Sequence, residues 1–215
     1  MRINSTLTVF AATGVFALLT AASPAAASFE YVADDGTGSV NVGPAIDGQM
    51  LWGNYFYAES GRDIITTISV AFGNIAIGRE VTLLLFDDPD NDGNPNNATL
   101  LTQTTGLTDL PQSNVFIDFA ITPTQVTGGF FVAAMMDIVV GDRPGRLDPQ
   151  TVTGQSWISA GPSVDLNNLG GSLIYLNMQN NAVPGNWMVR ATAIPSPAGL
   201  AVLLCSTLAA RRRRR

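Results

Sequence analysis

The sequence predicts an all-β domain, an antiparallel β-sandwich of jelly-roll type, and three observations lead to this prediction. Short apolar or alternating segments recur between positions 50 and 192. Turn-forming Gly, Asn, Asp and Pro residues separate them. Away from the two ends of the chain, no segment keeps the 3.6-residue apolar period of a helix. Eight or more short strands at this spacing are typical of sandwiches.

The strands are expected in the following order. The first, residues 50–57, is rich in aromatic side chains, and the second, 64–72, places Ile64, Ile68, Val70 and Phe72 on one face. Residues 81–86 are apolar on both faces, as in a central strand, whereas 115–121 alternate. Later strands are predicted at 129–140, 157–158, 173–176 and 187–192. Residues 91–97, 141–145 and 177–186 are predicted as connections, because Asn, Gly and Pro are dense there.

The N-terminal segment predicts a secretory signal peptide. Met1 and Arg2 form a short positive region, residues 7–19 are largely apolar, and Ala25-Ala26-Ala27 is a small-residue cleavage site. Cleavage after Ala27 divides the chain into a signal peptide (1–27), a β-sandwich domain (28–193) and a C-terminal segment (194–215). The protein is therefore expected to be exported.

The C-terminal segment predicts membrane insertion that stops at its basic end. Ile194-Pro195-Ser196-Pro197 ends the folded domain, because the prolines continue neither strand nor helix. An uncharged run at 198–210 follows, and then come Arg211, Arg212, Arg213, Arg214 and Arg215, which stay on the cytoplasmic side of a bilayer. Thirteen residues at ~1.5 Å rise span only about 20 Å of a hydrocarbon core about 30 Å thick. A transient sorting signal suits this length better than a plain membrane anchor, which is the alternative.

In the order of its parts, this tail resembles the PEP-CTERM class of bacterial sorting signals. Pro195, Ser196 and Pro197 occupy the position of the family's tripeptide, with Ser196 where the family has glutamate. The resemblance implies an exosortase-type sorting enzyme as a partner, a membrane-inserted precursor, and a mature domain on the cell surface or in the extracellular matrix. The strand pattern also resembles a loosely defined jelly-roll module of exported bacterial proteins, which implies a fold and no catalytic motif.

Composition excludes several classes of function. The chain contains neither histidine nor lysine, and its one cysteine, Cys205, lies in the tail. This excludes Ser-His-Asp and Cys-His catalysis, zinc sites with His or Cys ligands, and disulfides within the chain. All 17 acidic residues lie in the predicted domain, opposed by five arginines, so that its net charge is −12. Such a domain repels nucleic acid and attracts divalent cations.

One segment has the pattern of a calcium (Ca2+) loop. Asp88, Asp90 and Asp92 have D-x-D-x-D-G spacing, and Gly93 stands where a sharp turn is needed. The backbone carbonyl of Asn94 is a further candidate ligand. Thr99 replaces the glutamate that completes an EF-hand, so a full EF-hand is excluded. The alternative is an acidic surface turn, but four aspartates within six residues repel one another unless a cation is bound.

Other candidates are less specific. Asp34 and Asp35, or Asp142 with Asp148, are expected to belong to ordinary loops rather than to further cation sites. Among the aromatic residues, Trp187 is expected in the core. The aromatic cluster at residues 52–57 is assigned with equal weight to sugar stacking or to the core.

Two functions remain open from the sequence. The first is a non-catalytic exported surface or matrix protein that is stabilised by calcium and binds carbohydrate, with exopolysaccharide as a partner. The second is a secreted carbohydrate-active enzyme that works with two carboxylates. The missing histidine and lysine, the small domain and the tail favour the first.

Overall fold

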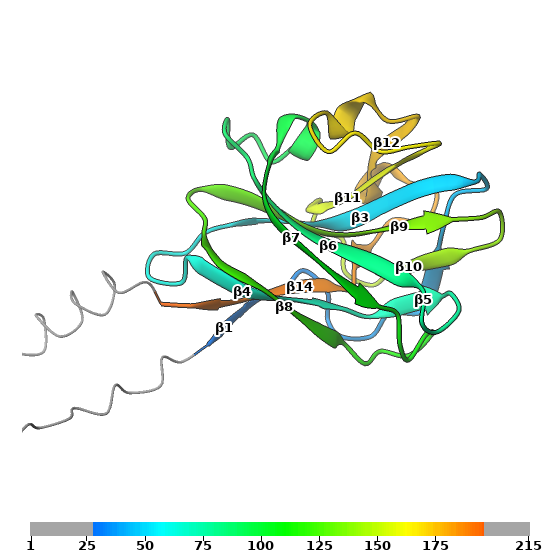
Figure 1. The fold of residues 1–215 in the computed structure, drawn as a ribbon, viewed down its shortest axis with the longest axis horizontal. Coiled ribbons are helices and arrows are strands. Elements are labelled where there is room, and N and C mark those ends of the chain that lie inside the picture. The colour runs from blue at the N-terminus through cyan, green and yellow to red at the C-terminus, as the bar shows by residue number, and fades with distance from the viewer. Residues whose placement is uncertain (1–27, 196–215) are drawn as a thin grey trace, which may run out of the picture.

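A computed structural model describes residues 28–195 and shows an all-β fold of antiparallel sheets in an open, sandwich-like arrangement (Figure 1). The predicted signal peptide, Ser196, Pro197 and Arg211–Arg215 lie outside these residues. Among the described residues, no helix is long and apolar enough to cross a membrane.

The largest sheet has six strands, here called the six-stranded sheet. Their order is β12 (Ile174–Asn177), β11 (Ser156–Gly161), β3 (Gly48–Tyr57), β9 (Gly129–Ile138), β6 (Glu80–Asp87) and β7 (Thr99–Leu107). The central strands β3, β9 and β6 come from distant parts of the sequence, so the sheet forms only when long-range pairs form.

Two smaller sheets oppose the six-stranded sheet. The terminal sheet holds both terminal strands, in the order β1 (Phe29–Tyr31), β14 (Val189–Ile194), β4 (Ile64–Val70) and β8 (Ile117–Gln125). The β10 sheet contains β13 (Asn186–Trp187), β10 (Arg143–Asp148) and β2 (Val40–Val42), with β5 (Phe72–Asn74) also paired to β10. Three 3-10 turns, η1 (Pro95–Asn97), η2 (Leu169–Gly171) and η3 (Met178–Asn180), lie in the connections.

The core lies between the six-stranded sheet and the two smaller sheets, and a second apolar layer covers the outer face of the six-stranded sheet. Strand β3 shows how the sequence builds both. Met50, Trp52 and Phe56 point into the main core, whereas Leu51 and Tyr55 point outward into a smaller cluster. Successive side chains of a strand face opposite sides, so an uninterrupted apolar run requires cover on both faces. Loops carrying η1 and η2 supply that cover on the outer face.

One buried polar side chain joins the layers. Asn54, on β3, is fully buried, and its amide nitrogen donates to the backbone oxygens of Trp187 and Val189, both at 2.7 Å. Its own oxygen accepts from the Ser156 hydroxyl at 2.5 Å. Because every polar atom of this side chain has a partner, its burial costs little and fixes the register between the sheets.

Most predicted strands are present, but several bounds differ. The strand predicted at 129–140 ends at Ile138, because Val139 and Val140 form an exposed turn. The strand predicted to begin at Val115 begins at Ile117. The prediction of a connection at 141–145 is wrong in part, since β10 begins at Arg143. The prediction for Trp187 is confirmed, because its side chain is fully buried.

Candidate metal centre

The acidic loop, defined as residues 88–98, connects β6 to β7 at one end of the six-stranded sheet (Figure 1). Its first residue stays attached to the sheet, because the Asp88 amide donates to the Gly129 oxygen at 3.0 Å. The chain then curls back on itself. Asn91 and Gly93 take left-handed backbone conformations, with φ of 56° and 82°, and the Asn91 amide donates to the Asp88 oxygen at 3.2 Å. Asn and Gly are the residues that adopt this conformation most readily.

This curl brings the three predicted aspartates together. One carboxylate oxygen from each of Asp88, Asp90 and Asp92 lies within 4.8 Å of the others, and such a group can hold a metal ion. Asp88 is 1% exposed, whereas Asp90 and Asp92 lie at the surface. The cluster therefore has a buried floor and an open, solvent-facing side.

A hydrogen bond from a different donor orients each carboxylate and uses one of its oxygens. The donors are the Tyr55 hydroxyl to Asp88 Oδ2 at 2.7 Å, the Asn97 side-chain amide to Asp90 Oδ2 at 2.8 Å, and the Asn94 backbone amide to Asp92 Oδ1 at 2.7 Å. Fixed carboxylates lose little freedom when an ion binds, which favours binding.

At the buried floor of the cluster, one carboxylate oxygen of Asp88 has no hydrogen-bond donor among the described residues. Asp88 Oδ1 is buried and accepts no hydrogen bond from residues 28–195. Burial raises the pKa of Asp88, and the nearby Asp90 raises it further, although the bond from Tyr55 opposes these effects. The bond from Asn97 lowers the pKa of Asp90. A buried carboxylate oxygen without a donor is costly, and a bound cation removes that cost.

Asn94 shapes the loop through contacts other than the predicted one. Its backbone amide is the donor to Asp92, and its side-chain oxygen accepts from the Tyr175 hydroxyl on β12. The Tyr175 ring stacks on Trp157, with ring centroids 5.3 Å apart. Coordination by the Asn94 carbonyl stays a prediction.

The aromatic residues of β3 divide between core and surface. Trp52 and Tyr55 are buried, so sugar stacking on these two rings is excluded. Tyr57 is 54% exposed and lies beside the acidic loop, with its hydroxyl 3.5 Å from the Asn91 backbone oxygen. Tyr55 and Tyr57 contact each other edge to face, with centroids 5.2 Å apart.

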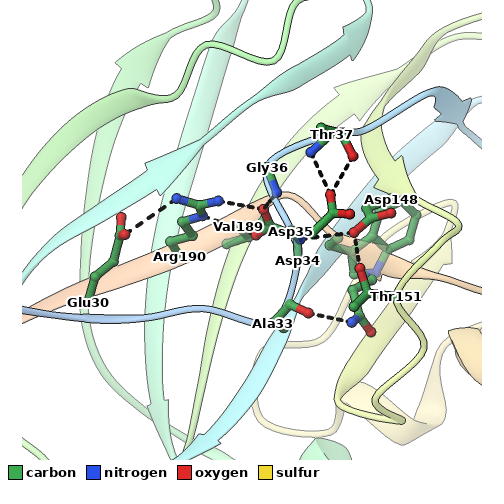
Figure 2. A network of polar contacts seen from close by, with 12 residues as sticks. Glu30, Ala33, Asp34, Asp35, Gly36, Thr37, Asp148, Thr151, Val189 and Arg190 are labelled. Atoms are coloured by element: carbon green, nitrogen blue, oxygen red, sulfur yellow. Dashed lines mark hydrogen bonds and ion pairs between the residues drawn. The ribbon is translucent and has the colours of Figure 1, made fainter.

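The acidic residues drawn in Figure 2, among them Asp34 and Asp148, interact with donors within the protein. Asp34 forms an ion pair with Arg190 at 2.6 Å, and Glu30 lies on the other side of the same guanidinium at 3.3 Å. Asp148 accepts from the backbone amides of Asp35 and Gln150 and from the Thr151 hydroxyl. These carboxylates are therefore structural, in contrast to Asp88.

The outer face has one further feature at its opposite end. A hollow of about 230 Å³ is lined there by Gln49, Arg79, Glu80, Thr82, Met135, Met136 and Asp137. The Arg79 guanidinium forms an ion pair with Asp142 at 3.0 Å and donates to the Asp137 backbone oxygen at 2.6 Å. Two carboxylates, those of Glu80 and Asp137, border this hollow.

Sequence reasoning missed the two tyrosines that hold the acidic loop, one through Asp88 and the other through Asn94. Tyr55 lies 33 positions before Asp88, and Tyr175 lies 81 positions after Asn94. No short motif links residues at such separations. The one available signal was the alternation on β3, which places Tyr55 and Tyr57 on the same face.

Comparisons with known proteins show similarity in fold. No protein-family profile and no curated protein sequence matches the chain. A structure of Cwp84, a clostridial cysteine protease, after propeptide cleavage aligns with a TM-score of 0.55 and 12% identity. The alignment covers 79% of this chain and 40% of that one. A structure of the cysteine protease and lectin-like domains of Cwp84, a surface layer associated protein of Clostridium difficile, gives a TM-score of 0.47 and 12% identity over 69% and 33% of the two chains.

Proposed function

We propose that this chain is a non-catalytic exported protein of the cell surface or extracellular matrix, sorted through its C-terminal segment and stabilised by calcium at the acidic loop. Support for export and sorting comes from the predicted signal peptide and from the order of proline motif, apolar run and arginines at the C-terminus. The partners in this proposal are an exosortase-type enzyme and, before processing, the membrane.

The jelly-roll type of the sandwich belongs to the same proposal. The jelly-roll assignment is supported by the order in which successive strands join the two layers. Strand β3 lies in the six-stranded sheet and β4 in the terminal sheet, β6 and β7 return to the first, β8 joins the second, and β9 returns again. Distant strands thereby become neighbours, as in double Greek-key sandwiches.

A single observation supports the ion most strongly: the buried, unpartnered oxygen of Asp88 beside Asp90 and Asp92. The ion is proposed to be calcium because only oxygen ligands are present and because calcium accepts irregular geometry, whereas Mg2+ requires a near-ideal octahedron. A cation also relieves the repulsion among the three carboxylates.

The test is thermal unfolding of the full chain, exported by a bacterial host, purified from its exported fraction and stripped of metal. A ligand at 100 times its Kd stabilises the native state by ~2.7 kcal/mol. At about 2–4 °C per kcal/mol for a domain of this size, Tm rises by roughly 5–10 °C. Magnesium should raise it less.

The test variant is Asp90→Asn with Asp92→Asn, which should not respond to calcium. The control is Asp109→Asn with Asp165→Asn, two exposed aspartates whose side chains each accept a backbone hydrogen bond, as that of Asp92 does. Both pairs remove the same charge, so the control should respond like the wild type. Equal responses from all three proteins would show general charge screening and would refute the site.

A further inference from the structure

We propose that the calcium ion of the acidic loop binds a neutral saccharide through two adjacent hydroxyl groups, and that the ring of Tyr57 packs against the sugar. This inference rests on the calcium site proposed above. It assigns that site a ligand in addition to a role in stability.

The first step is the open side of the cluster. Calcium takes six to eight oxygen ligands. Asp88 closes the floor, while Asp90 and Asp92 are exposed, so an ion held by the three carboxylates keeps coordination positions that face solvent. Water fills such positions when no other ligand is present. Two neighbouring hydroxyls of a sugar are hard oxygen ligands at a spacing that suits one large cation, and they can displace that water.

The second step is the exposed ring at the edge of the loop. Tyr57 is 54% exposed although it is large and partly apolar, and its neighbour on the same face, Tyr55, donates directly to Asp88. The edge-to-face contact with Tyr55 holds the Tyr57 ring in place. An exposed aromatic ring with a fixed orientation offers an apolar surface to the C–H face of a sugar, while its hydroxyl remains at the Asn91 oxygen.

The third step is charge. The predicted domain has a net charge of −12, so an anionic polymer is repelled by the domain as a whole. A neutral saccharide meets no such repulsion. Its hydroxyls also need only replace water, so the ion and the ring together decide whether it binds.

The experiment uses the full exported chain in native gels that contain neutral polysaccharides, with calcium or with a chelator. The wild type should be retarded by at least one polymer, and only with calcium. A soluble sugar with two adjacent hydroxyl groups should compete, whereas its analogue lacking one of them should not. Tyr57→Ala should weaken retardation by about tenfold, equivalent to ~1.4 kcal/mol, and should leave the calcium-dependent rise in Tm unchanged.

Two variants serve as controls. Tyr57→Phe keeps the ring and should bind like the wild type. Leu173→Ala removes an apolar side chain that is even more exposed, at 71%, on the loop before β12, and should also bind like the wild type. Stabilisation by calcium without retardation by any polymer would overturn this inference and leave the proposed function intact. Retardation that persists in chelator, or that is as strong in Tyr57→Ala as in the wild type, would overturn it as well. If calcium does not stabilise the wild type, the ion site itself is wrong.

Discussion

The ion pair between Arg190 and Asp34 gives the sharpest prediction for stability. Asp34 has a fully buried side chain, and that of Arg190 is 17% exposed. The guanidinium donates two hydrogen bonds to the carboxylate, from Nη2 to Oδ1 at 2.6 Å and from Nε to Oδ2 at 3.1 Å. It also lies over the Phe116 ring, 4.0 Å from the centroid. The pair joins the segment after β1 to β14, and Figure 2 shows the guanidinium between Asp34 and Glu30.

Arg190→Met removes the cation but keeps much of the apolar stem. It leaves a buried carboxylate without a counter-charge, which typically costs about 3–5 kcal/mol. At about 2–4 °C per kcal/mol, Tm should fall by roughly 6–20 °C. Since folded domains are stable by about 5–15 kcal/mol, the variant should still fold at low temperature, and urea unfolding in the cold can measure it.

A second variant separates the lost charge from lost packing. Adding Asp34→Asn removes the stranded charge, and the amide oxygen can still accept from the Gly36 backbone, as Asp34 Oδ1 does at 2.8 Å. The double variant should therefore be more stable than Arg190→Met alone, recovering more than half of the loss. A cost below about 1 kcal/mol for Arg190→Met, the level of an exposed pair, would refute this reasoning. So would a double variant that is no more stable than the single one.

Two further predictions concern acid stability and processing. Burial alone would raise the pKa of Asp148, but hydrogen bonds from Thr151 and from backbone amides lower it below its ordinary value of 3.8. Its contribution to stability is therefore present above that value and lost as the pH falls through the lowered pKa. Asp148→Asn should destabilise the protein at neutral pH by more than at acid pH, and urea midpoints across the range would test this. Replacing the arginines at 211–215 with Ser should leave unprocessed precursor, and intact-mass analysis of surface-extracted wild type should find no species ending at Arg215.

The sequence predicted those strands whose burial leaves an apolar pattern. Strand β6 is apolar on both faces because the core lies on one side and the outer cluster on the other. Strand β7 was missed, because it lies at the edge of the sheet and five of its nine residues are exposed, including threonines. Strand β10 was missed because it begins Arg-Pro-Gly. A side chain at Gly145 would lie 2.6 Å from the Trp187 ring, so packing against a distant residue requires the glycine that made the segment look like a turn.

The candidate site was predictable only in its local part. The spacing of Asp88, Asp90 and Asp92 follows from one short loop, and a turn with Gly93 is enough to bring them together. The burial of Asp88 and the exposure of Tyr57 depend instead on how β3, β6 and β9 are ordered in the sheet. That order is a property of long-range pairing, which single-sequence patterns do not encode.

If the domain is exported as proposed, the pairing of β1 with β14 has a consequence for the timing of export. Phe29 lies opposite Ala193, so the two ends of the domain form adjacent antiparallel strands beside each other (Figure 1). A chain that crosses a membrane from its N-terminus delivers β1 first and β14 last. Strand β1 therefore has no partner strand while nearly the whole domain is translocated. The terminal sheet is completed only when β14 has emerged. In this proposed export, the terminal sheet closes only after the whole domain has been translocated, and its closure brings the residues next to both predicted processing sites side by side.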